Sequence, residues 1–188
     1  DVYKRQAQIP WFPAWGIEFQ SPVKDPKKLV ETWLEIRASE RWVMISETVA
    51  ASERHLWGVW SHAARNELLG KMVARTIDAE FIRILSGTHQ IRVAFERAGV
   101  RKGDKHAWIL CLPEHPGFDA FGQSKSYPSH DRTQEIEASK AMSWLNGDLW
   151  TARPSPNSDG LDRLGLNRDL KFEQIESSML SHAASADI

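Results

Sequence analysis

The stretch HAWILCL, residues 106–112, decides the fold class of this chain. From Trp108 onward it is continuously apolar, and Pro113 follows it directly. A strand that is covered on both faces has such an unbroken apolar run, and proline ends a strand because it has no backbone N–H to donate. The stretch therefore predicts a strand that lies inside the molecule with both faces covered.

The segments on either side of this strand predict further strands and several helices. Apolar residues alternate over 15–20, and short apolar runs at 42–45 and 149–152 also favour strands. Apolar residues recur at helical spacing in six segments, at about 25–38, 52–70, 76–86, 88–99, 133–145 and 170–184. This pattern predicts a mixed α/β (α+β) fold, a small mixed β-sheet packed with helices in a single domain. It does not give the strand order.

The composition is that of an ordinary globular protein with no overall charge bias. The chain has 188 residues, 41% of them hydrophobic and 26% charged, with a net charge of -1. Any nucleic-acid site must therefore be a local patch. Residues 1–10 show no periodicity, and we expect them to be disordered or artefactual. A single domain is expected over 11–188, with a loop insertion at about 113–132.

The sequence also bears on the compartment. It has a single cysteine, Cys111, which fits a reducing environment because no intrachain disulfide can form. Its apolar runs are far shorter than the roughly 20 residues of a membrane span. No segment has the pattern of a secretory signal. We therefore expect a cytoplasmic protein without a membrane partner.

A search for catalytic residues finds no recognisable constellation. His106 and Cys111 lie five positions apart in the predicted strand, so they face opposite sides, and a buried structural cysteine is the better interpretation. The loop residues His115, Asp119 and His130 lack the spacing of known metal ligands. We predict no catalytic residue, metal or cofactor. The alternative is a small α/β enzyme with a site in the 114–131 loop, which would need a cleft joining that loop to His89 or His106.

The segment from Lys71 to Lys105 is the most informative part of the chain. It carries eight Lys or Arg and four Asp or Glu residues, a local net charge of +4. Arginine side chains can contact phosphates and stack on bases. A solvated helical face with ion pairs, such as Glu96 with Arg92, would explain the same charges.

The same segment resembles the TPRKB (PRPK-binding protein) family of the KEOPS complex, in its archaeal type. The resemblance rests on Ala74-Arg75-Thr76, on Ser86-Gly87-Thr88-His89-Gln90-Ile91 and on Ala94-Phe95-Glu96-Arg97-Ala98-Gly99-Val100, in that order. It is clear over about 53–112 and weaker in the C-terminal helix. The 114–131 loop has no counterpart in it.

The resemblance implies a non-catalytic regulatory subunit. Such a subunit docks on the kinase-like ATPase subunit of KEOPS and acts indirectly with the threonylcarbamoyl transferase subunit. It also helps to recruit tRNA by the single-stranded 3′ CCA end, for threonylcarbamoyladenosine modification beside the anticodon. A generic protein-interaction domain without RNA binding is a further alternative.

Unpaired bases and phosphates are bound by positive charge and by flat or apolar surfaces. The residues expected near RNA are therefore basic side chains, an amide, an isoleucine and a glycine that lets the backbone approach closely. They are Lys71, Arg75, Arg83, Gly87, Gln90, Ile91 and Arg92. Arg75 could instead bind a neighbouring carbonyl, and Gly87 could simply end a helix. The interpretation fails if the basic side chains are locked in internal ion pairs.

The final helix is the candidate for docking on the kinase-like subunit, since docking of this kind uses an exposed apolar helical face. The predicted contact residues are Phe172, Ile175, Met179 and Leu180. Packing of this stripe into the core explains it equally well.

Overall fold

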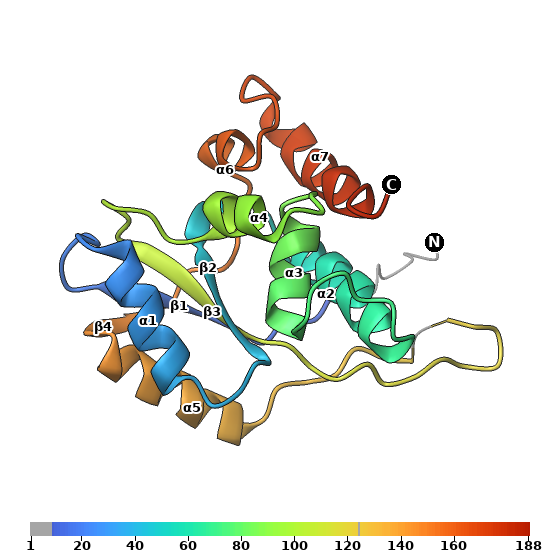
Figure 1. The fold of residues 1–188 in the computed structure, drawn as a ribbon, viewed down its shortest axis with the longest axis horizontal. Helices are drawn as coiled ribbons and strands as arrows, with labels where there is room; N and C mark the ends of the chain where they lie inside the picture. The colour runs from blue at the N-terminus through green and yellow to red at the C-terminus, as the bar shows by residue number, and fades with distance from the viewer. Residues whose placement is uncertain (1–8, 124) are drawn as a thin grey trace, which may run out of the picture.

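The computed structural model describes residues 9–123 and 125–188, and strand β3 lies inside its four-stranded sheet (Figure 1). The strand order is β2-β3-β1-β4, with β1 at Ala14–Phe19, β2 at Trp42–Ser46, β3 at His106–Cys111 and β4 at Gly147–Trp150. All three pairings are antiparallel. The predicted fold class is confirmed, but the expected mixture of strand directions is wrong, because apolar spacing marks a strand without fixing its direction.

The two faces of β3 belong to two different hydrophobic cores. Trp108 and Leu110 point into the larger core, whereas Ala107, Ile109 and Cys111 point into the smaller one. Successive side chains of a strand alternate between its faces, so one strand can serve both cores. The prediction that this strand is covered on both faces is confirmed.

Helices cover both faces of the sheet (Figure 1). The smaller core is closed by α1 and α5, and the larger core mainly by α2, α3, α4 and α7. The helices are α1 (Pro26–Ile36), α2 (Glu53–Leu68), α3 (Ile77–Leu85), α4 (Ile91–Ala98), α5 (Arg132–Trp144), α6 (Ser158–Arg163) and α7 (Phe172–Ala184), with a 3-10 turn η1 at Glu47–Val49.

Most helix boundaries follow from local capping chemistry. Asp25 accepts a hydrogen bond from the Lys28 backbone N–H at 3.1 Å, with Pro26 in the first turn of α1. Helix α6 was not expected, because its residues overlap a polar stretch that resembles a turn. It forms because Leu161 and Leu164 bury completely in the larger core.

The described residues between β3 and α5 form no helix or strand. That residues 113–132 are an insertion stays a prediction. Residues 1–8, within the segment expected to be disordered or artefactual, lie outside the described residues.

A histidine is sealed into the larger core at the start of α2. His55 has no exposed surface, and its Nδ1 accepts a hydrogen bond from the Ala51 N–H at 3.1 Å. Burial, together with repulsion from His182, lowers the pKa of His55 to about 4. The ring is therefore neutral at neutral pH, and it must gain a proton in a buried position if the pH falls.

We predict that His55 makes the protein less stable in mild acid. Its pKa is lower in the folded state than the ordinary 6.5 of an unfolded chain, so the unfolded state binds more protons between these values. Stability from this group is complete above about pH 6.5 and is lost as the pH falls towards 4. Between pH 7.5 and 5 the loss amounts to about 2 kcal/mol.

Urea unfolding of the wild type and of His55→Gln at a series of pH values measures this loss. The variant lacks the titrating ring, so its stability should change less over the same range. Parallel curves for the two proteins would contradict the prediction.

Candidate interaction site

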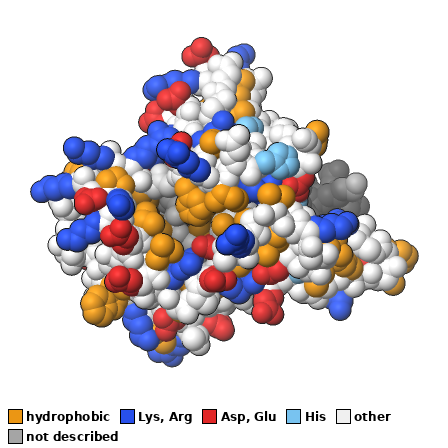
Figure 2. All heavy atoms as spheres, in the orientation of Figure 1, with side chains coloured by type: hydrophobic (Ala, Val, Ile, Leu, Met, Phe, Trp, Pro, Cys, Tyr) orange, Lys and Arg blue, Asp and Glu red, His pale blue; other side chains and the backbone are white. Residues whose placement is uncertain are grey.

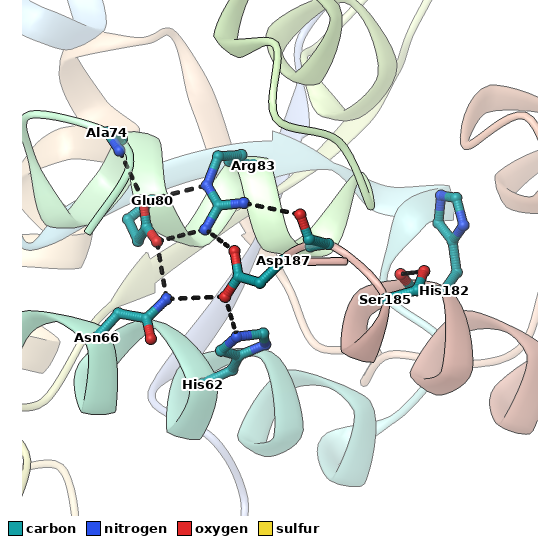
Figure 3. A network of polar contacts seen from close by, with 9 residues as sticks. His62, Asn66, Ala74, Glu80, Arg83, His182, Ser185 and Asp187 are labelled. Atoms are coloured by element: carbon teal, nitrogen blue, oxygen red, sulfur yellow. Dashed lines mark hydrogen bonds and ion pairs between the residues drawn. The ribbon is translucent and has the colours of Figure 1, made fainter. Parts of the chain in front are cut away.

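Helix α3 carries an ion pair that is sealed from solvent (Figure 3). Glu80 and Arg83 have no exposed side-chain surface, and Arg83 Nη2 lies 2.5 Å from Glu80 Oε1. The same nitrogen donates to Asp187 Oδ1 at 2.7 Å, and Nη1 donates to the Ala186 carbonyl at 3.2 Å. The guanidinium thus binds the segment that follows α7.

Further polar groups complete this network. Asn66 on α2 donates to Glu80 Oε1 at 3.0 Å and to Asp187 Oδ2 at 3.2 Å, and His62 lies 2.6 Å from the same Asp187 oxygen. The Ala74 backbone N–H donates to Glu80 Oε2 at 2.9 Å. The network connects α2, α3, the segment before α3 and the C-terminal segment.

The charges of the network stabilise one another. Burial by itself would raise the pKa of Glu80, but hydrogen bonds from Arg83, Ala74 and Asn66 outweigh it and hold the pKa below its ordinary value. Burial would also raise the pKa of Asp187, but hydrogen bonds from Arg83, Asn66 and His62 together hold it below its ordinary value. Both carboxylates are therefore ionised at neutral pH, and Arg83 neutralises part of their charge.

The position of Arg83 in this network shows that one predicted RNA contact is wrong. Arg83 was expected near the RNA surface, but it is fully buried among carboxylates and carbonyls and does not reach the surface. A signal was present in the sequence: Glu80 and Arg83 are three apart, as helical ion pairs are, in a helix otherwise rich in apolar residues. The contribution of Asp187 has no local signal, because it lies over a hundred positions away.

The junction between α3 and α4 is held by contacts to one carbonyl. The Ser86 carbonyl accepts a hydrogen bond from Arg97 Nη1 at 2.9 Å and lies 2.9 Å from His182 Nε2. Gly87 has φ +62, which favours glycine, and a Cβ there would lie 2.5 Å from His182 Nε2. The space that Gly87 leaves open is therefore occupied by the His182 ring of α7.

The other predicted RNA residues lie at two separate places. Lys71 and Arg75 are exposed ahead of α3, whereas Gln90 and Arg92 are exposed after it, with Ile91 partly exposed. Helix α3 has nine residues and so separates them by roughly 14 Å at 1.5 Å per residue. The structure does not gather them into one pocket. The expected ion pair of Arg92 with Glu96 is present at 3.2 Å.

Two of the docking residues predicted on α7 are buried and cannot contact a partner. Ile175 and Met179 are 3% and 0% exposed and belong to the larger core. Phe172 is 62% exposed, and Leu180 is partly exposed. The inward stripe is set by the spacing of four between Ile175, Met179 and Ala183, and the opposite face, which carries Gln174, Ser177 and Ser181, is exposed to solvent.

Leu180 lines a groove of about 790 Å³ between α2 and α7. Leu69, Ala183 and Ala184 supply further apolar surface, and Lys71 lies at its edge. A residue predicted to dock a partner and one predicted to contact RNA therefore share this groove.

The 113–132 loop packs on the tryptophans of α2. Tyr127 lies 4.7 Å from Trp57 between ring centroids, and His115 stacks on Trp60 at 6.1 Å. His106 lies at the other end of β3 and stacks on Trp150 at 4.1 Å. The length of the strand therefore separates His106 from this loop.

Cys111 is a buried structural cysteine, as predicted. Burial raises the pKa of its thiol to about 11, so it is protonated at neutral pH. Within residues 9–123 and 125–188, no group of three or more His, Cys, Asp or Glu side chains is placed to hold a metal ion.

The fold and these contacts define a helix-covered antiparallel α/β domain in which buried charges tie helices together and other charges remain on the surface. A family model described as kinase binding protein CGI-121 matches residues 21–143, about two thirds of the chain. The chain belongs to the CGI-121 family, and the resemblance to the TPRKB family is confirmed. The match extends beyond 53–112 and includes the 113–132 loop, whereas α6 and α7 lie outside it.

Comparison with curated proteins finds no match. Within the described residues, no helix combines the length and the apolar character needed to cross a membrane.

We predict that Arg83 stabilises the fold and that Arg92 does not. Replacing Arg83 by Met leaves Glu80 and Asp187 without their buried partner, and breaking a buried ion pair in this way lowers the free energy of unfolding by about 3–5 kcal/mol. Arg92 is 91% exposed in its side chain, so Arg92→Met changes stability by no more than about 0.5 kcal/mol. Urea unfolding of both variants measures the difference, and equal losses would contradict it.

Proposed function

We propose that this chain is a non-catalytic regulatory subunit of the KEOPS complex. In this role it binds the kinase-like ATPase subunit and helps to recruit tRNA through the 3′ CCA end, for threonylcarbamoyladenosine modification beside the anticodon. It works in the cytoplasm and acts on the transferase subunit only through the complex.

One observation carries the proposal, the match of residues 21–143 to a family described as a kinase binding protein. The matched range contains the whole Lys71–Lys105 segment, which supplies the motifs that resemble TPRKB proteins.

The exposure of part of the basic segment supports RNA binding. Lys71, Arg75, Gln90 and Arg92 all reach solvent, and an RNA strand is held by charges along its backbone and by contacts to unpaired bases. With Arg83 removed from the set, the RNA surface is proposed to run along α3 from Arg75 to Arg92. An RNA single strand can follow such a length, whereas a small ligand cannot.

Two accessible apolar side chains of α7 support a docking surface. Phe172 and Leu180 are the accessible members of the predicted set, and Leu180 continues into the groove beside Leu69. Large apolar side chains at the centre of an interface carry most of its binding energy.

The enzyme alternative has less support. It needed a cleft joining the 114–131 loop to His89 or His106. His106 stands at the far end of β3, and Tyr127 and His115 of the loop stack on Trp57 and Trp60 of α2. The loop thus contributes Tyr127 and His115 to contacts with α2.

We predict that Phe172→Glu and Leu180→Glu weaken binding to the kinase-like subunit at least tenfold, because each places a charge in an apolar contact. The wild type should co-elute with that subunit in size-exclusion chromatography and raise its ATPase rate. Leu149→Glu is the matched control, since Leu149 is 59% exposed on β4 and should bind as the wild type does. A wild type that neither co-elutes nor stimulates at micromolar concentration would refute the docking function.

We predict that the protein binds intact tRNA more tightly than tRNA trimmed of its CCA end, and that Arg75→Glu removes the difference. The added negative charge repels the phosphates that Arg75 would attract. Arg132→Glu, on the exposed start of α5, serves as a charge-matched control. Equal affinity of the wild type for both tRNAs, measured by filter binding at fixed salt, would exclude the CCA function and leave kinase docking intact.

A further inference from the structure

One end of the molecule collects basic side chains from two loops that are distant in the sequence and from the first turn of α1. The β1–α1 loop and the α4–β3 loop lie together because Gly103 N–H donates to the Val23 carbonyl at 2.8 Å and Val23 N–H donates to the Asp104 carbonyl at 2.9 Å. Six exposed Lys and Arg side chains result, which we call the basic end: Lys24, Lys27, Lys28, Arg101, Lys102 and Lys105. In Figure 2 blue side chains gather on the left, where Figure 1 shows these loops.

The two carboxylates in these loops are already engaged. Asp25 Oδ1 accepts the Lys28 backbone N–H at the start of α1. Both oxygens of Asp104 bind Arg163, at 2.6 and 3.0 Å. Within residues 9–123 and 125–188, none of the six basic side chains forms a salt bridge. Arg101 Nη2 donates to the Glu96 carbonyl at 3.0 Å, and the lysines are exposed to solvent.

A pocket of about 370 Å³ adjoins the basic end where α1 meets the end of α5. Trp144 lines it with a side chain that is 69% exposed. The lining residues also include Lys24, Lys28, Gln20 and Asn146, and Asp25, whose Oδ1 caps α1. The Gln20 N–H donates to the Asn146 carbonyl at 3.2 Å, which ties the two walls together.

These groups match the chemistry of an unpaired nucleotide. An indole face stacks on a base of any identity, amides can donate to and accept from a base edge, and lysines attract phosphate. We propose that the pocket binds an unpaired RNA base through Trp144 and that the basic end binds the adjoining phosphates. The proposal extends the proposed function to a second RNA surface and rests on it only in assuming that the chain meets RNA.

The pocket favours RNA over other acidic partners. An anionic membrane would be met by the lysines and by Trp144 lying at the lipid surface, but it offers no planar base to stack on the indole within the pocket. In a folded acidic protein the Asp and Glu carboxylates are not covalently joined to a planar ring. Unpaired RNA supplies the planar group and the negative charges within one nucleotide.

The test measures binding of a ten-nucleotide unpaired RNA by fluorescence anisotropy. Trp144→Ala should weaken binding about tenfold or more, as loss of a stacked base does, and Trp144→Phe should keep most of the affinity because a ring remains. Phe121→Ala is the control for an exposed aromatic side chain, since Phe121 is 90% exposed on the 113–132 loop. Thermal melting of each variant checks that it is folded.

The salt dependence tests the phosphates separately. Lys24→Ala and Lys28→Ala should each reduce the slope of log K against log salt by about 0.7, the value per phosphate contact for a single strand. Lys125→Ala, which removes an exposed lysine from the 113–132 loop, should leave the slope unchanged.

Four results would overturn the inference, and they separate it from the proposed function. If Trp144→Ala binds as the wild type does while Arg75→Glu loses affinity, RNA uses the first surface alone. If Trp144→Ala loses affinity but both lysine variants keep the wild-type slope, the basic end does not contact phosphate. Loss of binding to phosphatidylserine vesicles in Trp144→Ala, with RNA binding unchanged, would assign this end to membranes. If the wild type binds no RNA, both proposed RNA surfaces are excluded, and kinase docking is tested separately by the co-elution and ATPase assays.

Discussion

Strand β3 imposes the constraint on which the rest of the structure depends. It has hydrogen-bonded neighbours on both edges and a hydrophobic core on each face. A strand in this position needs helices on both faces to exclude water. One layer, α1 and α5, brings the end of α5 beside the start of α1, and the other layer holds the buried network of Arg83. The two layers give the molecule separate surfaces, and each carries its own set of exposed charges.

Arg83 divides the basic segment into an internal and an external part. A guanidinium without solvent needs charged partners, and Glu80 and Asp187 supply them from α3 and from the C-terminal segment. This pairing fixes the end of α7 against α3. On helix α7, Met179 lies in the core and Leu180 lines the groove beside α2. Part of the positive charge of the Lys71–Lys105 segment therefore stabilises the fold, and only the exposed basic side chains are available to a partner.

The sequence predicted the elements of the fold better than their arrangement. Apolar spacing located each strand and six of the helices within a few residues, since periodicity is a local property. It missed α6, whose leucines find their partners only in the folded core. The contacts of the site could not be predicted because they join residues far apart in the sequence. Asp187 binds Arg83, the His182 ring packs against Gly87, and Met179 of α7 lies in the core. The basic end escaped prediction because Lys24 and Arg101 belong to segments far apart in the sequence, which backbone hydrogen bonds bring together only in the folded chain.

The spacing of the exposed charges favours a long polymer as the ligand. Arg75 precedes α3, Arg92 lies at the start of α4, and Arg101 follows α4. Helix α4 has eight residues, or roughly 12 Å, so each step along this path is longer than a single nucleotide. The net charge of -1 gives no long-range attraction, and at physiological salt each site acts over about 8 Å. An RNA strand in contact with several sites gains affinity because the second contact becomes intramolecular, whereas a small anion meets one weak site at a time.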